Sequence, residues 1–314
     1  MKSLVPFFEE LFYAPSWYHW LIAILLLPFS ALYCLIATIK KIFCFPARET
    51  VPLISIGNLT VGGSGKTPLL IALAKNYNSV AVVLRGYKRK SQGIVQVSKK
   101  GKILVNVEQS GDEAMLIAKS LPQATVWVAS DRKKAIELAK KEGAKVTFLD
   151  DAFHTCLQKF DILIQRRPKN PFCLPSGPFR LPKLFEKFAD FIAVEGRDFT
   201  RKVHIVNPTK KMVLLTAIAN PQRLEPYLPQ GIKKYYFPDH HFFTNEELEA
   251  IWQKEQPDSF LVTSKDLVKL EQFSYPLSLL ELDIEVASQL REAIDNFIQK
   301  VSNAKEDSNC SNTS

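Results

Sequence analysis

A glycine-rich stretch followed by lysine and threonine, residues 57–67, lies between an apolar run and a helical pattern. Its glycines let the backbone turn sharply and aim N–H groups at phosphate oxygens, and the following helix adds its positive dipole end. Lys66 would neutralise the outer phosphates of a nucleotide, and the Thr67 hydroxyl would bind Mg²⁺. This order of strand, loop and helix predicts a P-loop for ATP and Mg²⁺. The predicted cofactor-binding residues are Thr60, Val61, Gly62, Gly63, Ser64, Gly65, Lys66 and Thr67.

This stretch departs from the general P-loop form at one position. The general form has a glycine five residues before Gly65, where this chain has Thr60. The alternative interpretation is a glycine-rich turn that joins a strand to a helix. We favour the P-loop because Gly-Lys-Thr stands where the chemistry needs it.

Two carboxylates end the apolar run of residues 146–149. In P-loop enzymes, an aspartate at the end of such a strand holds Mg²⁺. Asp150 is the first candidate for this role and Asp151 is the second. Acidic residues also cap strand ends and turns, so this interpretation depends on the P-loop upstream.

Two other stretches offer groups for acid–base chemistry. Asp112 lies in the first turn of a helix whose start is marked by a capping box of Ser110 and Glu113. His240 lies in an Asp-His-His loop before another predicted helix, and a loop histidine beside a carboxylate can move protons. From spacing alone, Asp112 could merely occupy its helix turn, and His240 could belong to a solvated loop.

Arginines follow several of the predicted strands. Tyr87 lies in a basic loop at 85–90, Arg132 follows another strand, and Arg180 lies in a Gly-Pro-Phe-Arg loop. Arginine suits bidentate phosphate binding, although solvated basic loops are the alternative. The net charge of +9 also favours anionic partners, such as phosphates or a membrane surface. Nucleic acid is not expected, because the sequence contains no recognised nucleic-acid-binding module.

Strands and helices alternate from residue 51 onward, which is typical of a parallel sheet covered by helices. Ligands of such a sheet bind beyond the carboxyl ends of its strands. The sequence therefore predicts an α/β protein: a P-loop NTPase-type parallel-sheet domain with a second, smaller α/β domain and an N-terminal membrane helix. The predicted strands are 53–56, 80–84, 94–97, 103–106, 124–128, 145–149, 162–165, 191–194, 212–218, 233–237 and 260–263, and the predicted helices are 69–75, 111–119, 131–141, 222–227, 245–253 and 286–301.

Residues 14–39 contain no Asp, Glu, Lys or Arg. About 20 such residues can span a bilayer, and Lys40, Lys41 and Arg48 mark the following end as cytoplasmic. Pro28 would kink the helix, so a helix that lies in the membrane surface stays open beside a spanning one. A buried core helix is a further alternative. A cleaved signal peptide fits worse because the apolar run is too long.

The predicted domains are consecutive: residues 1–48 are membrane-associated, 49–200 form the P-loop core, 201–301 form the smaller α/β domain, and 302–314 form a polar, disordered tail. The five cysteines are scattered and form no C-x-x-C pair. They indicate neither a zinc site nor a disulfide framework, so a reduced, cytosolic catalytic part is the simplest interpretation.

Other classes of P-loop protein would carry signatures that differ from this sequence. A GTPase switch would carry Asn/Thr-Lys-x-Asp, whereas here Lys265 is followed directly by Asp266. A transport ATPase subunit would carry a Leu-Ser-Gly-Gly-type signature, which the sequence lacks. A non-catalytic lipid-binding protein would have no need of an intact Lys66 and Asp112.

Together these residues resemble the tetraacyldisaccharide 4'-kinase family of lipid A biosynthesis, over nearly the whole chain. The resemblance covers the N-terminal apolar segment and a series of motifs whose order and spacing are specific. The motifs are Gly57–Pro68, Arg85-Gly86-Tyr87, Gly111-Asp112-Glu113, Asp150-Asp151, Gly177-Pro178-Phe179-Arg180, Asp239-His240 and Thr263-Ser264-Lys265-Asp266.

The resemblance implies that ATP phosphorylates the 4'-hydroxyl of a tetraacyl disaccharide 1-phosphate at the cytoplasmic face of the inner membrane. The partners would be this lipid and membrane lipids, without nucleic acid, and a monomer is expected. The resemblance also implies that Asp112 is the catalytic base, paired with His240. The remaining expected site residues are Lys66 in catalysis, Tyr87, Arg132 and Arg180 at the substrate and its phosphates, and Thr67, Asp150 and Asp151 at Mg²⁺.

The chain departs from the family pattern at several positions. The family's Asp-Asp-Gly-Phe-Gln-His has Ala152, His154 and Thr155 at three of its positions here. Leu181 stands where the family has an acidic residue, and Ser264 stands where it often has glutamate. These departures could change the surroundings of the metal or the preference for acyl chain or nucleotide.

Overall fold

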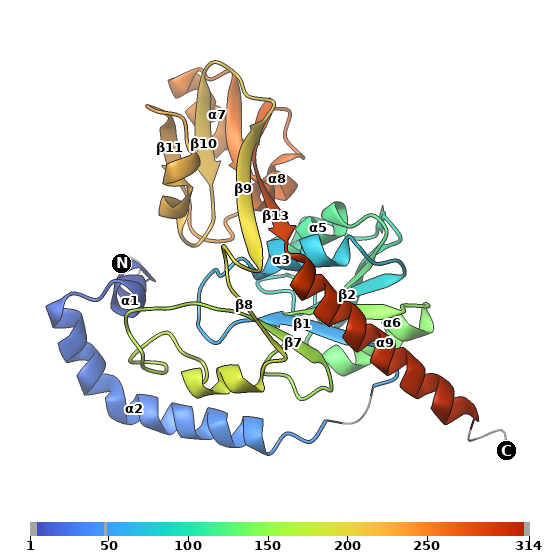
Figure 1. Ribbon diagram of the computed structural model, residues 1–314. Helices are drawn as coiled ribbons and strands as arrows, with labels where there is room; N and C mark the ends of the chain where they lie inside the picture. Colours follow the sequence, from blue (N-terminus) through green and yellow to red (C-terminus); the bar gives the residue numbers. More distant parts are fainter. Residues whose placement is uncertain (1–4, 47–48, 311–314) are drawn as a thin grey trace. The chain divides into compact units, whose positions relative to one another are not determined.

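The computed structural model describes residues 5–46 and 49–310 of the chain (Figure 1). The chain divides into two compact units. One unit comprises Met1–Lys66, Asp151–Asp198 and Ser288–Ser314, and the other comprises Thr67–Asp150 and Phe199–Ala287. The two units therefore alternate along the chain, whereas the sequence predicted consecutive domains. That domain division stays a prediction.

The first unit contains three parallel strands. β1 (Leu53–Gly57) pairs with β7 (Phe160–Ile164), and β7 pairs with β8 (Phe191–Ala193). Every residue of β1 and β7 is buried, as is typical of parallel strands, whose sequences are almost continuously apolar. The other elements of this unit are α1 (Val5–Tyr13), α2 (Trp17–Ile42), the 3₁₀ helix η1 (Lys183–Phe188) and α9 (Ser288–Cys310).

The second unit contains strands β2 to β6 and a separate five-stranded sheet. β2 pairs in parallel with β5 and β6, whereas β3 is antiparallel to β5, and β4 is antiparallel to β3. These elements are β2 (Val80–Leu84), β3 (Ile94–Lys99), β4 (Lys102–Ile103), β5 (Thr125–Ala129) and β6 (Val146–Asp150), with α3 (Lys66–Ala74), α4 (Val107–Ser110), α5 (Asp112–Ser120) and α6 (Arg132–Lys141).

The five-stranded sheet has the order β11-β10-β12-β13-β9, in which only β9 is antiparallel to its neighbour. Its apolar core includes Phe243, Leu248 and Phe260. The elements are β9 (Phe199–Val206), β10 (Met212–Thr216), the 3₁₀ helix η2 (Pro221–Tyr227), β11 (Lys233–Tyr236), α7 (Asn245–Glu255), β12 (Ser259–Thr263), α8 (Ser264–Leu270) and β13 (Leu277–Val286).

The predicted α/β class with a parallel sheet is confirmed, but two strands were missed. β9 lies in the stretch 196–211 that the sequence analysis treated as a polar boundary, and β13 was not predicted. These strands pair along their length and carry charged side chains on an exposed face, where Lys202 lies 2.5 Å from Glu285. Such alternation of charged and apolar residues in an antiparallel ribbon is easily taken for a loop.

The C-terminal tail also differs from its expectation. α9 continues to Cys310, into the polar stretch 302–314 that the sequence predicted to be a disordered tail. The rest of the predicted tail, residues 311–314, lies outside the described residues, as does Arg48.

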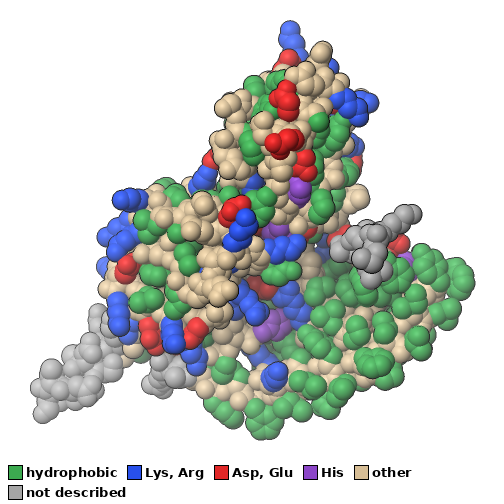
Figure 2. Space-filling model, turned by 180° about the vertical axis from the view of Figure 1, so that it is seen from behind, with side chains coloured by type: hydrophobic (Ala, Val, Ile, Leu, Met, Phe, Trp, Pro, Cys, Tyr) green, Lys and Arg blue, Asp and Glu red, His purple; other side chains and the backbone are tan. Residues whose placement is uncertain are grey.

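α2 is the helix that the uncharged run predicted, and it continues through Pro28. By length and composition alone it could cross a membrane. Large apolar side chains, among them Leu25 and Phe29, are exposed along it. Figure 2 shows hydrophobic side chains gathered in one broad area of the surface.

Cysteine pairing corrects a second expectation. Cys44 and Cys156 form a disulfide, with 5.6 Å between their Cα atoms and 112 residues between them in sequence. Cys34 and Cys173 are free, and their sulfur atoms lie 3.0 Å apart. The search for C-x-x-C spacing missed both pairs because it detects only cysteines that are close in sequence.

Candidate active site

The P-loop begins where β1 ends, and a second loop holds it in place. The N–H of Val61 donates to the carbonyl of Pro178 at 2.9 Å, and that of Arg180 donates to the carbonyl of Leu59 at 2.7 Å. Gly62 and Gly65 have φ values of 84° and 82°, in the left-handed region that favours glycine. The Gly-Pro-Phe-Arg loop, predicted only as a phosphate contact, thus also supports the backbone of the P-loop.

Lys66 lies at the first position of α3, as the motif predicted. Its ammonium group donates to the side-chain oxygen of Asn58 at 3.0 Å and lies 3.7 Å from the carboxylate of Asp151. Asn58 is buried and also donates to the hydroxyl of Thr60, at 3.2 Å. Thr60, where the general P-loop has glycine, is therefore part of the network that holds Lys66.

Asp151 brings two of the predicted site residues together. Its carboxylate accepts a hydrogen bond from Arg180 at 2.6 Å and faces Lys66. Its N–H donates to the carbonyl of Ile56, and its φ of 49° turns the chain sharply after β6. Burial raises the pKa of Asp151, but the charges of Lys66 and Arg180 outweigh this effect and hold the pKa below its ordinary value.

The second unit holds Asp112 against His240. Asp112 is the first residue of α5 and is 3% exposed, and Nδ1 of His240 lies 2.9 Å from both of its carboxylate oxygens. The N–H of His240 donates to the carbonyl of Ala217, and the ring of Tyr87 lies 5.4 Å from the imidazole. Residues 128 positions apart in sequence thus form one hydrogen-bonded pair.

Two lysines of α8 complete the surroundings of Asp112. Nζ of Lys265 lies 3.7 Å and Nζ of Lys269 4.0 Å from the Asp112 carboxylate. Burial raises the pKa of Asp112, but the hydrogen bond to His240 and the charges of the two lysines lower it by more. The carboxylates of Asp112, Glu113 and Asp239 in turn raise the pKa of Lys265 against the effect of burial.

Lys269 is the residue of this cluster that sequence reasoning missed. It is 1% exposed and lies 3.0 Å from the carboxylate of Asp266, itself fully buried. Asp266 accepts hydrogen bonds from the hydroxyl of Thr216 and from the N–H of Ala217, the residue whose carbonyl binds the N–H of His240. The only available signal was the spacing of four residues from Lys265, which places both lysines on one face of a helix.

Arg132 and Asp150 form a third group, also in the second unit. The guanidinium of Arg132 donates to the carbonyl of Asp150 at 2.9 Å. Asp150 is buried at the end of β6, where the sequence placed it. Thr67 lies in the first turn of α3. The structure thus places every predicted site residue at a strand end, a helix start or a loop.

Two of the departures from the family pattern lie in the interior. Ala152 is fully buried, and Leu181 is 2% exposed in an apolar cluster with Phe153 and Phe179. An acidic side chain at position 181 would be costly in such surroundings. His154 is exposed.

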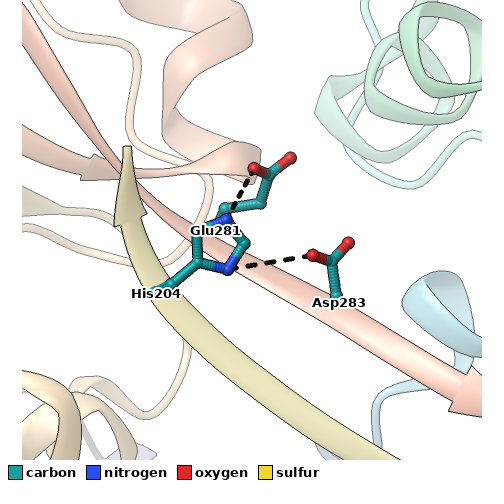
Figure 3. Close-up of side chains that lie close together, drawn as sticks. All are labelled: His204, Glu281 and Asp283. Carbon is teal, nitrogen blue, oxygen red and sulfur yellow. Dashed lines mark ion pairs between the residues drawn. The ribbon is translucent and has the colours of Figure 1, made fainter. Parts of the chain in front are cut away.

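Among the described residues, one group of histidine and carboxylates has ligand atoms close enough together to share an ion: His204, Glu281 and Asp283 (Figure 3). They lie on the β9–β13 ribbon, with the imidazole 3.3 Å from Glu281 and 3.8 Å from Asp283. All three side chains are at least two-fifths exposed. Cross-strand ion pairing accounts for this arrangement.

Comparison with known proteins gives consistent matches. Residues 22–300 match the family described as tetraacyldisaccharide-1-P 4'-kinase. The chain is 44% identical over 301 residues to the tetraacyldisaccharide 4'-kinase of Helicobacter acinonychis, covering 95% of this chain and 96% of that protein. It is 43% identical to the one of Campylobacter jejuni, over 95% and 98% of the two chains. The structure also resembles a crystal structure described as the "apo" form of LpxK from Aquifex aeolicus in complex with ATP, with a TM-score of 0.74. The two sequences are 30% identical, and the match covers 88% of this chain and 99% of that one.

Proposed function

The chain belongs to the tetraacyldisaccharide-1-P 4'-kinase family and is a kinase, and we propose that it transfers the γ-phosphoryl group of ATP to the 4'-hydroxyl of an acylated disaccharide 1-phosphate in lipid A biosynthesis. The observation that carries the proposal is the pairing of Asp112 with His240. A sugar hydroxyl loses its proton as it accepts a phosphoryl group, and this pair can take that proton.

ATP is assigned to the P-loop. Backbone N–H groups of residues 60–67 would surround the phosphates, and Lys66 would neutralise the charge that they carry. Asn58 and Asp151 hold the Lys66 side chain in the loop, so its rotamer freedom is already restricted. Arg180 forms an ion pair with the carboxylate of Asp151, and it would also bind phosphate oxygens of the nucleotide.

The donor set also suits Mg²⁺. Thr67, Asp150 and Asp151 offer the hard oxygen ligands that this ion prefers. The carboxylate of Asp151 faces two cationic side chains, which favour its ionised form, and Mg²⁺ would share its oxygens with them. When bound, Mg²⁺ would neutralise charge on the phosphates.

Asp112 is the general base of the proposed reaction. The low pKa of its carboxyl group keeps it ionised at neutral pH, so it can accept the proton of the 4'-hydroxyl as the oxygen bonds to the γ-phosphorus. The bond from the γ-phosphorus to the bridging oxygen breaks, and ADP leaves with the electron pair. His240 orients the carboxylate and shares the proton. Tyr87, 63% exposed beside the imidazole, is assigned to substrate contact, and Arg132 to phosphate.

We assign the protein to the cytoplasmic face of the inner membrane, with α2 lying in the membrane surface. The helix is apolar on its exposed face, but other positions along it are buried against its own unit. Ser30 donates to the carbonyl of Cys173, and Lys41 donates to that of Phe153. A helix with one face on protein and one on lipid suits an interfacial position and access to a lipid substrate. We expect a monomer whose one chain supplies every assigned site residue.

The proposal is tested by phosphate transfer from radiolabelled ATP to a tetraacyl disaccharide 1-phosphate in detergent micelles. Wild type should label this lipid and should not label an analogue without the 4'-hydroxyl. Lys66→Ala should abolish transfer, whereas Lys75→Ala, which removes an exposed lysine just after the same helix, should not. Equal labelling of the 4'-deoxy analogue would show that another group accepts the phosphoryl group. Full activity of Lys66→Ala would show that the P-loop does not bind the ATP that reacts.

A further inference from the structure

We propose that the N-terminal helices position the nucleotide site as well as attaching the protein to a membrane, with Tyr13 and Lys41 as the positioning residues. Tyr13 ends α1 and binds the P-loop, and Lys41 lies near the end of α2 and binds the loop that carries Asp151. The inference rests on the proposed function, which assigns these two loops to the nucleotide site. The contacts that carry it all lie within the first unit.

The buried face of α2 has a regular spacing. His19, Ala23 and Ser30 are buried, and Cys34 and Lys41 are half-buried, so these positions recur at intervals of four or seven residues, that is, of one or two helical turns. Such spacing places them on one face. Unlike an ordinary surface helix, α2 therefore docks through small and polar side chains and exposes its large apolar ones. The docked face makes directed hydrogen bonds, which fix the position of the helix along its axis.

Tyr13 makes the contact at the nucleotide loop itself. Its hydroxyl donates to the carbonyl of Val61, the second residue of the predicted phosphate-binding stretch 60–67. Arg166 donates to the Tyr13 hydroxyl at 3.1 Å, and its guanidinium lies 4.5 Å from the centre of the tyrosine ring. A Cβ on Gly62 would lie 3.3 Å from the same hydroxyl, so the tyrosine closely approaches the loop. This hydrogen bond sets the direction of the Val61 carbonyl, and with it the peptide plane that carries the N–H of Gly62.

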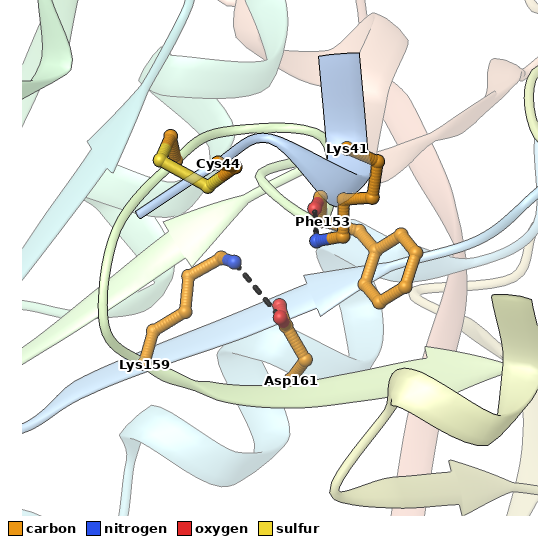
Figure 4. Close-up of a disulfide and its surroundings, with 6 residues drawn as sticks. Lys41, Cys44, Phe153, Lys159 and Asp161 are labelled. Atoms are coloured by element: carbon orange, nitrogen blue, oxygen red, sulfur yellow. Dashed lines mark hydrogen bonds and ion pairs between the residues drawn. A yellow bond between two sulfur atoms is a disulfide. The ribbon is translucent and has the colours of Figure 1, made fainter. Parts of the chain in front are cut away.

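Lys41 makes the corresponding contact at the other end of the helix pair (Figure 4). Its ammonium group donates to the carbonyl of Phe153 at 2.7 Å and lies 4.2 Å from the centre of the Phe153 ring. The adjacent Lys40 is exposed. The uncharged run predicted both lysines as flanking charges of a membrane helix, but the structure uses only Lys41 to hold a loop.

The loop that Lys41 holds is short and connects directly to the site. Asp151, which faces Lys66 and Arg180, lies two residues before Phe153. Phe153 is fully buried, and a Cβ on Gly57 would lie 3.1 Å from the Cβ of Phe153, so the ring packs at the start of the P-loop. The Cys44–Cys156 disulfide fixes the far end of the same loop to the chain that follows α2. A displacement of α2 would therefore move the loop that carries Asp151.

The test compares two conservative variants with matched controls. Tyr13→Phe and Lys41→Met each remove one hydrogen bond and keep the size of the side chain. Tyr18→Phe and Lys40→Met remove the same groups from exposed positions of α2. All four variants are assayed in micelles with a thiol reductant, so that the disulfide does not hold the loop by itself. Hydrogen exchange is measured in parallel on the nucleotide-free protein.

Each test variant should lower kcat about tenfold, because small misplacements of a site are costly in rate, with KM for the lipid unchanged. Amide exchange should accelerate about tenfold at residues 61–65 in Tyr13→Phe and at residues 151–157 in Lys41→Met. Lys41→Arg, which can still donate to the Phe153 carbonyl, should restore most of kcat. Both controls should match wild type in rate and exchange.

Test variants that match their controls in both rate and local exchange would overturn the inference. A uniform increase of exchange across the first unit, with a lower melting temperature and unchanged kcat, would also overturn it, since that result assigns a purely structural role. Failure of the proposed function has a different signature. Wild type itself would then be inactive on the disaccharide, while the exchange measurement would still report whether the helices hold the two loops.

Discussion

At the scale of single residues, the central feature is a carboxylate surrounded by an imidazole and two ammonium groups. Asp112 is almost fully buried, and such a group is tolerated as an anion only if nearby charges and hydrogen bonds replace its hydration. His240, Lys265 and Lys269 supply them. The same surroundings that stabilise the anion make it a weak base, so its catalytic value must come from position rather than from a high pKa.

Asp112 and His240 should behave as one unit. Asp112→Asn should lower kcat by about 10²–10⁴-fold with little change in ATP affinity, because it removes the proton acceptor and keeps the shape. His240→Ala should have a similar effect, and the double variant should lose little more than either single variant. Steady-state kinetics of the three variants measure this. Strictly multiplicative losses would show independent roles, and a large loss of ATP affinity in Asp112→Asn would make it a metal ligand instead.

Lys269 should contribute to the position of the acid limb of the pH–rate profile, together with His240 and Lys265, whose effects on the pKa of Asp112 are larger. The base works only when ionised, so kcat should rise with pH through the pKa of Asp112, which its surroundings hold below the ordinary value. Lys269→Met removes a positive charge 4.0 Å from the carboxylate, which should raise that pKa and move the limb to higher pH. The other charged groups near this carboxylate, Lys265, Glu113, Asp239 and Asp266, stay in place.

Profiles of kcat against pH for wild type, Lys269→Met and Lys133→Met provide the measurement, since Lys133 is an exposed lysine of α6. The Lys133 variant should follow wild type. If Lys269→Met melts like wild type and its acid limb does not move, then the charge of Lys269 does not influence the pKa of Asp112.

At the scale of elements, the predicted P-loop depends on a second loop, residues 170–180, that packs against it. Residues 170–180 form a tight loop in which Asn170 is fully buried and donates to the carbonyls of Leu11 and Ser176. The end of this loop pairs with the P-loop and delivers Arg180 to Asp151. The sequence predicted Arg180 as a phosphate ligand, but it gave no sign of these supporting contacts, because they join residues that are distant in sequence.

Gly177 should be essential to this loop. A Cβ at this position would lie 2.4 Å from both the Asn170 side-chain oxygen and the Phe172 carbonyl oxygen, a contact that requires the backbone to shift. Gly177→Ala should therefore lower the melting temperature and reduce phosphate transfer more than tenfold through displacement of Arg180. Gly143→Ala is the control: its Cβ would meet open space, at a backbone cost of about 1 kcal/mol for its φ of 89°. Similar stability and activity for the two variants would contradict this packing argument.

At the scale of the whole molecule, local sequence patterns predicted where strands and helices begin and end better than they predicted which distant residues meet. The positions of Lys66 and Thr67 at a helix start and of Asp150 at a strand end were predictable because these are short, continuous signals, whereas their roles at ATP and Mg²⁺ stay predictions. The apolar runs also gave most strands, since parallel strands are buried along their whole length. The alternation of the two units along the chain, the Cys44–Cys156 disulfide and the docked face of α2 were not predictable, because each depends on contacts between distant residues.

Membrane attachment should depend on the exposed apolar face of α2 rather than on the net positive charge. Leu25 and Phe29 are 77% and 64% exposed, so Leu25→Gln with Phe29→Gln should leave the docked face intact while removing apolar area from the membrane contact. Co-sedimentation with anionic vesicles should fall at least tenfold in this double variant. Leu138→Gln, which changes an exposed leucine of α6, should sediment like wild type. Attraction through the basic surface would weaken strongly in about 1 M salt, whereas apolar insertion would not. If the double variant sediments like wild type at low salt and both are released by high salt, the positive surface is the anchor and α2 serves only to hold the nucleotide site.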